Sequence, residues 1–177
     1  MYYGELKKCD IANGSGVRVS LFVSGCTNRC KNCFQPQTWD FCYGKPFTAD
    51  TVQEICGELD KPYVSGLSIL GGEPFEPANQ GEILALLRGV KVRYPKKNVW
   101  IFTGFRLEDE LCRQGAYPCR RETAEILSLT DILVDGRYED ALHNISLQFR
   151  GSSNQRIIDM KATRASGRLT LWADCRR

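Results

Sequence analysis

The sequence predicts an α/β fold, an incomplete (β/α) barrel with parallel strands inside and helices outside. Short apolar runs that end in glycine alternate with longer segments of helical periodicity, a pattern typical of a parallel sheet with right-handed crossovers. The chain has 177 residues, whereas a complete (β/α)₈ barrel typically needs about 250. We therefore expect a barrel that lacks some of its strands.

Four strands and four helical segments are expected in alternation. The strands span residues 17–23, 66–70, 98–104 and 131–136, and the helical segments span 48–59, 80–94, 107–113 and 121–129. Thr48 is a suitable N-cap for the first helix, and Pro95 ends the second. Because sites in such folds lie at the carboxyl ends of the strands, the small and polar strand endings predict a site along one rim.

The two ends of this pattern are less regular. A glycine-rich turn at residues 13–18 is most simply a hairpin turn, and the alternative is that Arg18 and the turn approach a cofactor. After Gly136, late strands are expected at residues 156–160 and 169–172. We expect one domain over residues 1–177, with an atypical C-terminal extension after about residue 156.

Composition indicates an ordinary soluble protein. The hydrophobic share is 42% and the charged share is 25%, which is typical of globular domains. A net charge of +3 is too small to indicate a nucleic acid or membrane partner, and neither a membrane span nor a signal peptide is evident. Most of the nine cysteines are expected to be buried or reduced thiols, which fits a cytoplasmic protein better than a secreted disulfide scaffold.

Three cysteines follow the first expected strand at the spacing C-x₃-C-x₂-C. They are Cys26, Cys30 and Cys33. Three close thiolates can bind three corners of an iron–sulfur cube and leave one iron open to a small molecule, whereas a purely electron-carrying cluster normally has four cysteine ligands. The spacing therefore predicts a [4Fe-4S] cluster that does chemistry at its open iron.

Other interpretations of these cysteines fit less well. Structural zinc needs four ligands, usually as two separated pairs, and the only histidine, His143, is distant in the sequence. Disulfides at such tight spacing have poor geometry. Cys9 or Cys42 could supply a fourth ligand, but neither has a companion at ligand spacing.

A second group of candidate residues, Gly71, Gly72 and Glu73, follows the second expected strand. Two glycines allow a ligand to approach the backbone closely, and the carboxylate can accept a hydrogen bond from an ammonium group. Alone, this sequence is a plausible tight turn. Placed downstream of C-x₃-C-x₂-C, it resembles the corresponding motif of the radical S-adenosylmethionine superfamily.

The resemblance implies that S-adenosylmethionine binds the open iron of the cluster and that Gly71–Glu73 hold its methionyl amine. It further implies that Thr103 and Asp135, at the ends of later strands, line the ribose and methionyl part of the site, although each could belong to a plain turn. One departure concerns the adenine contact. Many members carry an aromatic residue directly before the last cysteine, where this chain has Asn32, and Phe34 comes just after it.

Most of the chain is similar to the family of proteins that activate anaerobic (class III) ribonucleotide reductases. The segments that carry the similarity are residues 10–18, 21–26, 71–74, 100–104, 133–137 and 150–155. This resemblance implies reductive cleavage of S-adenosylmethionine and hydrogen abstraction from a glycine of the large reductase subunit. It also implies a reduced flavodoxin or ferredoxin as electron donor. Residues 112–121 and the tail after residue 156 depart from the family pattern.

Two other function classes remain open at this stage. One is a radical S-adenosylmethionine enzyme that acts on a small molecule in nucleoside biosynthesis. The other is a non-enzymatic iron–sulfur or zinc-binding module. The short chain leaves little room for a second substrate domain, which favours a substrate that is a loop of another protein.

Overall fold

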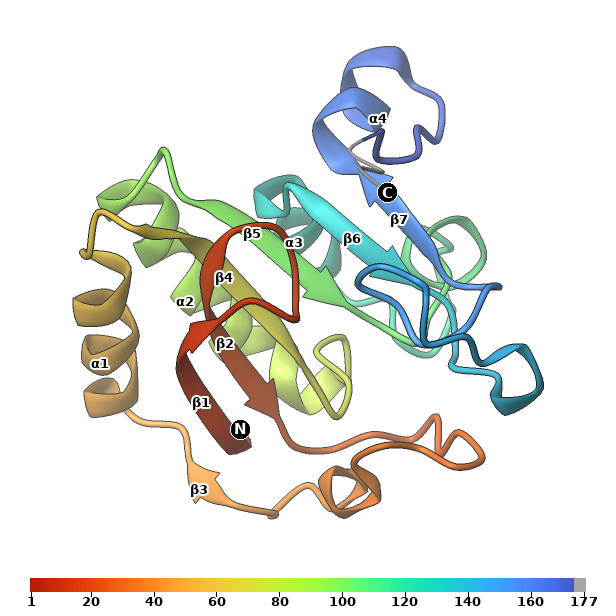
Figure 1. Ribbon diagram of the computed structural model, residues 1–177, viewed down its shortest axis with the longest axis horizontal. Helices are drawn as coiled ribbons and strands as arrows, with labels where there is room; N and C mark the ends of the chain where they lie inside the picture. Colours follow the sequence, from red (N-terminus) through yellow and green to blue (C-terminus); the bar gives the residue numbers. More distant parts are fainter. Residues whose placement is uncertain (174–177) are drawn as a thin grey trace.

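A seven-stranded sheet forms the centre of the computed structural model, which describes residues 1–173 (Figure 1). Its strands lie in the order β3-β1-β2-β4-β5-β6-β7. Their bounds are β1 Tyr2–Asp10, β2 Val17–Val23, β3 Lys45–Pro46, β4 Val64–Gly71, β5 Asn98–Phe102, β6 Ile132–Asp135 and β7 Arg156–Asp159. The four central strands β2, β4, β5 and β6 run parallel to one another.

The expected α/β class is confirmed, but the expectation of parallel strands throughout is wrong at both edges. β1 pairs antiparallel with β2 and with β3, and β7 pairs antiparallel with β6. A parallel neighbour needs a crossover of a dozen residues or so, whereas an antiparallel neighbour needs only a turn. The short connection between β1 and β2 therefore forces the antiparallel hairpin, and the expected hairpin turn is confirmed.

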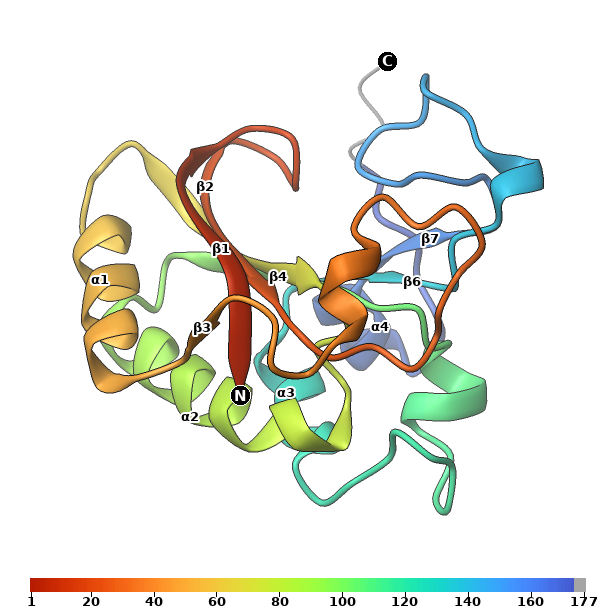
Figure 2. The same ribbon diagram turned by 90° about the horizontal axis from the view of Figure 1, so that it is seen from below.

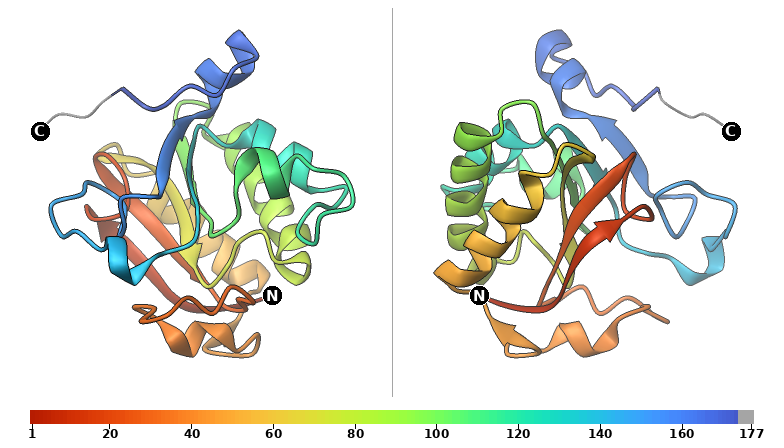
Figure 3. Two further views of the ribbon diagram at one scale, coloured as in Figure 1. Left: turned by 90° about the vertical axis from the view of Figure 1, so that its right-hand side faces the viewer. Right: turned by 60° about the vertical axis from the view of Figure 1, so that its left-hand side comes forward.

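In the described residues four α-helices accompany the sheet, namely α1 Ala49–Leu59, α2 Pro77–Arg93, α3 Thr123–Leu129 and α4 Met160–Ser166. The first three lie on one face of the sheet (Figure 3). Thr48 caps α1 in a capping box with Thr51, and α2 ends at Arg93, ahead of Pro95, as expected. The expected helix at residues 107–113 is only a π-helical turn, Leu107–Leu111. No helix within residues 1–173 has the length and apolar character that a membrane crossing requires.

Several expectations about individual segments are wrong. Strand β1 was not expected, because its charged residues obscure the alternation of apolar and polar residues that indicates a strand. Its pairing with β2 shows that it is one. Residues 160–166 form α4, since the Asp159 carboxylate accepts the Ala162 N–H at 2.9 Å and caps a helix there. Residues 169–172 contribute a single bridge, between Leu171 and Ile158, in place of a strand.

The cysteines outside the cluster motif are free thiols that differ in exposure. Cys9, Cys42 and Cys112 are exposed, and Cys56 and Cys119 are partly buried. Cys175 lies outside the described residues. All five described cysteines are free thiols, which fits the expectation of buried or reduced cysteines, although three of them lie at the surface.

The main hydrophobic core fills the space between the sheet and helices α1 to α3. In β5, Val99 and Ile101 point into this core, and Trp100 between them points to the opposite face, as alternation along a strand requires. There Trp100 packs edge-on against Trp172, with ring centroids 5.1 Å apart. These two tryptophans are packing residues. Both faces of the central strands are therefore covered, which explains their continuous apolar sequences.

Arg18 fastens the central strands and does not approach the cavity described below. Its buried guanidinium donates to Ser68 Oγ at 2.6 Å, to Asn98 Oδ1 at 2.7 Å and to the Leu67 carbonyl at 2.8 Å. Burial lowers the pKa of Arg18 to about 10, so the group stays charged at neutral pH. The alternative that Arg18 approaches a cofactor is therefore wrong. Asn13 of the same turn does line the cavity.

We expect replacement of Leu87 by alanine to destabilise the fold. Leu87 of α2 is fully buried in the main core, and such a truncation costs about 2–5 kcal/mol through lost burial and the cavity left behind. Urea unfolding followed by far-ultraviolet circular dichroism measures the change. Val92→Ala on the same helix, at a side chain that is 85% exposed, is the matched control and should cost less than about 0.5 kcal/mol. Equal losses in the two variants would contradict this assignment of the core.

Candidate metal and cofactor site

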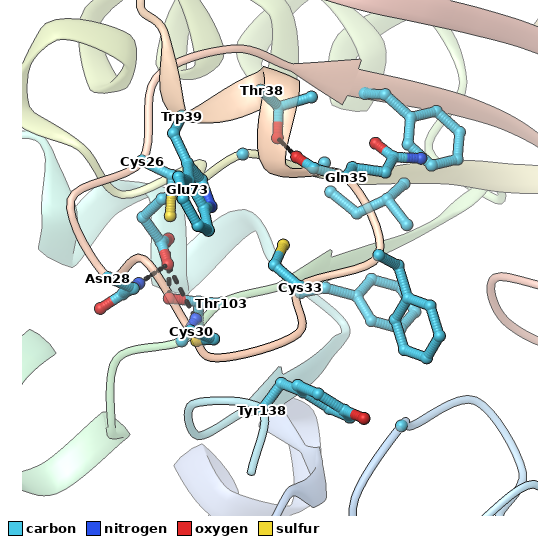
Figure 4. A pocket seen from close by; sticks show the side chains of 18 of the residues that line it. Cys26, Asn28, Cys30, Cys33, Gln35, Thr38, Trp39, Glu73, Thr103 and Tyr138 are labelled. Carbon is cyan, nitrogen blue, oxygen red and sulfur yellow. Dashed lines mark hydrogen bonds between the residues drawn. The ribbon is translucent and has the colours of Figure 1, made fainter. Parts of the chain in front are cut away.

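A cavity of about 310 Å³ lies where the carboxyl ends of β2, β4, β5 and β6 meet (Figure 4). Seven of the eight residues expected in the site line it: Cys26, Cys30, Cys33, Gly71, Gly72, Glu73 and Thr103. They come from segments that are up to 77 residues apart in the chain, counted from Cys26 to Thr103 (103 − 26). The parallel centre of the sheet brings these segments together, as the rim argument predicted.

The three cysteines lie on the segment after β2, residues 24–34, which we call the cysteine loop. Two of its residues other than glycine adopt left-handed backbone conformations, Arg29 at φ 45° and Asn32 at φ 55°. This region is unusual for residues other than glycine, and asparagine tolerates it best. The two reversals fold the loop back on itself, so that all three cysteines border the same cavity.

The loop after β6 holds the cysteine loop from the other side, and Figure 2 shows the two segments side by side. Asn32 Nδ2 donates to Asp140 Oδ2 at 2.7 Å. Phe34 packs against Tyr138, with ring centroids 5.3 Å apart. Asn32, at the position where an aromatic residue was expected, therefore serves as a link between loops, while Phe34 and Tyr138 supply aromatic surface to the cavity.

Two thiols of the loop, those of Cys26 and Cys30, are poor acids without a metal. Burial, together with the charge of Glu73, raises the pKa of Cys26 to about 12. Burial also raises the pKa of Cys30, although a hydrogen bond from the Tyr138 backbone N–H opposes the shift. Because metal ligation requires thiolates, a bound cation would have to displace these protons and compensate their charge.

Glu73 is fully buried and accepts four hydrogen bonds. Its Oε1 accepts from the Phe75 N–H at 2.9 Å and from Thr103 Oγ1 at 2.8 Å. Its Oε2 accepts from Asn28 Nδ2 at 3.0 Å and from the Gly104 N–H at 2.7 Å. Burial nevertheless raises the pKa of Glu73 to about 7, so a positive partner would favour its ionised form. Thr103 thus orients Glu73, a role that sequence analysis missed along with Asn28.

The two glycines of the Gly-Gly-Glu turn are required by a contact between backbones. Gly71 has a φ of 107°, and a Cβ added to Gly72 would lie 2.7 Å from the Gly25 carbonyl oxygen. The Gly72 N–H donates to the Val23 carbonyl, and the Glu73 N–H donates to the Gly25 carbonyl, both at 2.8 Å. The turn and the cysteine loop are thereby joined directly. We expected the glycines to allow a ligand to approach the backbone; the structure shows that they also allow the turn and the cysteine loop to approach each other.

Polar side chains at the start of α2 reinforce this junction, and sequence analysis did not single them out. Asn79 Nδ2 donates to the Ser24 carbonyl at 2.9 Å and to the Glu73 carbonyl at 3.0 Å. Glu76 Oε1 accepts from the Thr27 N–H at 2.7 Å and from Thr27 Oγ1 at 2.6 Å. Both side chains are buried. The sequence signal that could have indicated them is the spacing of Glu76 and Asn79, two polar residues three positions apart just before the apolar stripe of a helix.

Asp135 lies behind the cavity rather than among its lining residues. Its buried carboxylate accepts Arg156 Nε at 2.8 Å, a second contact from the same guanidinium, and the Leu107 N–H at 2.9 Å. The next residue, Gly136, does line the cavity. Asp135 therefore anchors the start of β7 and the turn after β5, and its oxygens are engaged by protein groups.

The residues present fit an iron–sulfur cluster with a bound small molecule. Trp39 also lines the cavity, and its buried indole N–H has no protein partner within the described part of the chain, so it can donate to a bound group. Within residues 1–173 no three His, Cys, Asp or Glu side chains converge as they would around a single metal ion. A cube does not need such convergence, because each cysteine binds a different iron. Cys9 and Cys42, the other possible ligands, do not line this cavity.

Comparison with known proteins identifies the family. A family model described as "4Fe-4S single cluster domain" matches residues 12–158. An "anaerobic ribonucleoside-triphosphate reductase-activating protein" of Enterobacteria phage T4 is 40% identical over 157 residues, which cover 89% of this chain and 93% of that protein. This chain belongs to that family. Proteins of the same name from Salmonella typhi and Escherichia coli K12 are 36% and 35% identical over 88% of this chain and 96% of their own lengths.

Alanine at any one of Cys26, Cys30 and Cys33 should prevent assembly of an intact cluster, because three ligands leave no redundancy. Iron and sulfide analysis and the visible absorption of anaerobically reconstituted protein measure the loss. Cys112→Ala and Cys119→Ala are the matched controls and should retain the cluster. Cluster loss in the Cys112 variant together with a normal cluster in Cys30→Ala would contradict the ligand assignment.

Proposed function

We propose that this protein is a glycyl radical activating enzyme that acts on an anaerobic ribonucleotide reductase. The observation that carries the proposal is the shared cavity of Cys26, Cys30, Cys33 and Glu73. The names of its relatives point to the same target. A three-cysteine site next to a buried carboxylate is suited to a [4Fe-4S] cluster whose open iron binds S-adenosylmethionine.

Each group at the cavity has a distinct task in this proposal. The three cysteines hold three irons, and Glu73, oriented by Thr103 and Asn28, accepts an N–H of the methionyl amine. Asp135 contributes indirectly by keeping the rim in place through Arg156. When bound, the reduced cluster would supply the electron for cleavage of S-adenosylmethionine to methionine and a 5′-deoxyadenosyl radical, and transfer of a hydrogen atom from the target glycine would leave 5′-deoxyadenosine and a glycyl radical.

The substrate of this reaction would be a loop of the large reductase subunit, in keeping with the names of the relatives. Phe34 lines the cavity, and its side chain is 71% exposed, so it offers an accessible apolar surface to such a loop. We further propose that the sheet is an incomplete (β/α) barrel of the radical S-adenosylmethionine type, that a reduced flavodoxin or ferredoxin donates the electron, and that the protein acts in the cytoplasm.

Glu73→Gln should weaken S-adenosylmethionine binding while the cluster is retained. The change keeps the shape of the side chain but removes its charge, and a charge-assisted hydrogen bond of this kind corresponds to about tenfold to a hundredfold in affinity. Because the pKa of Glu73 is raised to about 7, wild-type affinity should rise with pH through that value, and the variant should lack this dependence. Anaerobic titration followed by the cluster spectrum measures both, and unchanged affinity in the variant would remove Glu73 from the site.

The deciding experiment adds the large reductase subunit, S-adenosylmethionine and a reductant to the reconstituted protein. We expect a glycyl radical signal in electron paramagnetic resonance only when the reductase is present. The adenosyl radical must lie within contact distance of the hydrogen it takes, so the reaction depends on docking of the reductase. Alanine in place of the target glycine should abolish that signal while S-adenosylmethionine still binds. Rapid turnover of a small molecule in the absence of the reductase would instead support a small-molecule radical enzyme.

A further inference from the structure

A single buried carboxylate joins the cysteine loop to a surface segment, residues 112–121, that has no role in the site described above. Glu76, at the start of α2, is fully buried. Its Oε1 holds both the N–H and the hydroxyl of Thr27, at 2.7 and 2.6 Å. Its Oε2 accepts the Tyr117 hydroxyl at 2.8 Å. Tyr117 belongs to residues 112–121, the segment that departs from the family pattern.

The segment is held so that the Tyr117 hydroxyl points inward while its ring stays at the surface. The Tyr117 side chain is 52% exposed. Its ring lies 6.4 Å from that of Phe105 and carries the Arg120 guanidinium at 5.9 Å. Next to it, the Pro118 carbonyl accepts Gln80 Nε2 at 2.6 Å, which fixes the backbone against α2. Tyr117 is therefore placed by its surroundings, and its hydroxyl donates to Glu76 and also interacts with the Thr27 side chain.

We propose that Tyr117 is a positioning residue for the iron–sulfur cluster and acts on Cys26 through Glu76 and Thr27. This inference rests on the proposed function only in that the cysteine loop binds a cluster. Groups that hydrogen-bond around metal ligands orient them and tune the metal. Thr27 directly follows Cys26, so the direction of that thiolate depends on how firmly Thr27 is held.

Removal of the Tyr117 hydroxyl has a defined physical consequence. A buried carboxylate that loses one of its three donors is left incompletely satisfied, which costs free energy and lets it move or draw in water. Glu76 would then hold Thr27 less firmly, and the Cys26 thiolate would occupy a wider range of directions. Residues 112–121 thus contribute to the electronic environment of the cluster from the protein surface.

The test compares Tyr117→Phe with wild type in the full chain after anaerobic reconstitution. Phenylalanine keeps the ring contacts and removes only the hydroxyl. We expect iron release to a ferrous chelator to be about threefold to tenfold faster. The midpoint potential and the electron paramagnetic resonance line shape of the reduced cluster should shift as well, which a general loss of stability would not cause. Tyr63→Phe, at a side chain that is 57% exposed and precedes β4 at the opposite end of the sheet, is the matched control.

Variants of Glu76 establish whether the effect passes through this carboxylate. Glu76→Ala should release iron at least as fast as Tyr117→Phe, and the double variant should be no faster than Glu76→Ala alone. Glu76→Gln should approach wild type, since its carbonyl can accept from Thr27 and its amide can donate to the Tyr117 oxygen.

The possible failures are distinguishable. A wild-type protein that forms no iron–sulfur cluster would overturn the proposed function and this inference together. A wild type that loads normally, beside a Tyr117→Phe variant with unchanged iron release and potential, would overturn the inference alone. Additive effects of Tyr117→Phe and Glu76→Ala would also overturn it, because they would show that Tyr117 acts by another route.

Discussion

The site depends on the close approach of two backbone segments at the ends of β2 and β4. A Cβ added to Gly72 would lie 2.7 Å from the Gly25 carbonyl oxygen, so this position leaves no room for a side chain between the Gly-Gly-Glu turn and the cysteine loop. Two hydrogen bonds of 2.8 Å join the segments there. Everything else at the site is built on this junction, because it places the cysteines and Glu73 around one cavity instead of on separate surface loops.

Burial at this junction has an electrostatic cost that the protein offsets only in part. Burial raises the pKa of Cys26 to about 12 and that of Glu73 to about 7, so the anionic forms are disfavoured even where several N–H groups donate to them. A cationic metal centre beside the thiolates would reverse this preference. The cavity is thus arranged for a bound positive charge, and the neighbouring hydrogen-bond donors hold its geometry in advance.

The first turn of α2 illustrates how fold and site share the same residues. Asn79 binds the backbone of both loops, Glu76 binds the cysteine loop, and Gln80 binds the segment around Pro118. These side chains sit just ahead of the apolar stripe that packs α2 against the sheet. Because the helix is fixed by that core, the polar side chains can position three irregular segments that have little regular structure of their own.

Local patterns in the sequence determined the order of the central strands and helices, the rim, and the residues around Cys26 and Glu73, because periodicity, turn residues and ligand spacing are short-range properties. Tertiary structure decided what depends on contacts between distant residues. It paired β1 and β7 antiparallel to their neighbours β2 and β6, engaged Asp135 with Arg156 behind the rim, and assigned Thr103 to orienting Glu73. It also buried Glu76 between Thr27 and Tyr117, which are 90 residues apart (117 − 27). No local pattern encodes such a pairing, since only the packing of the folded chain brings its members together.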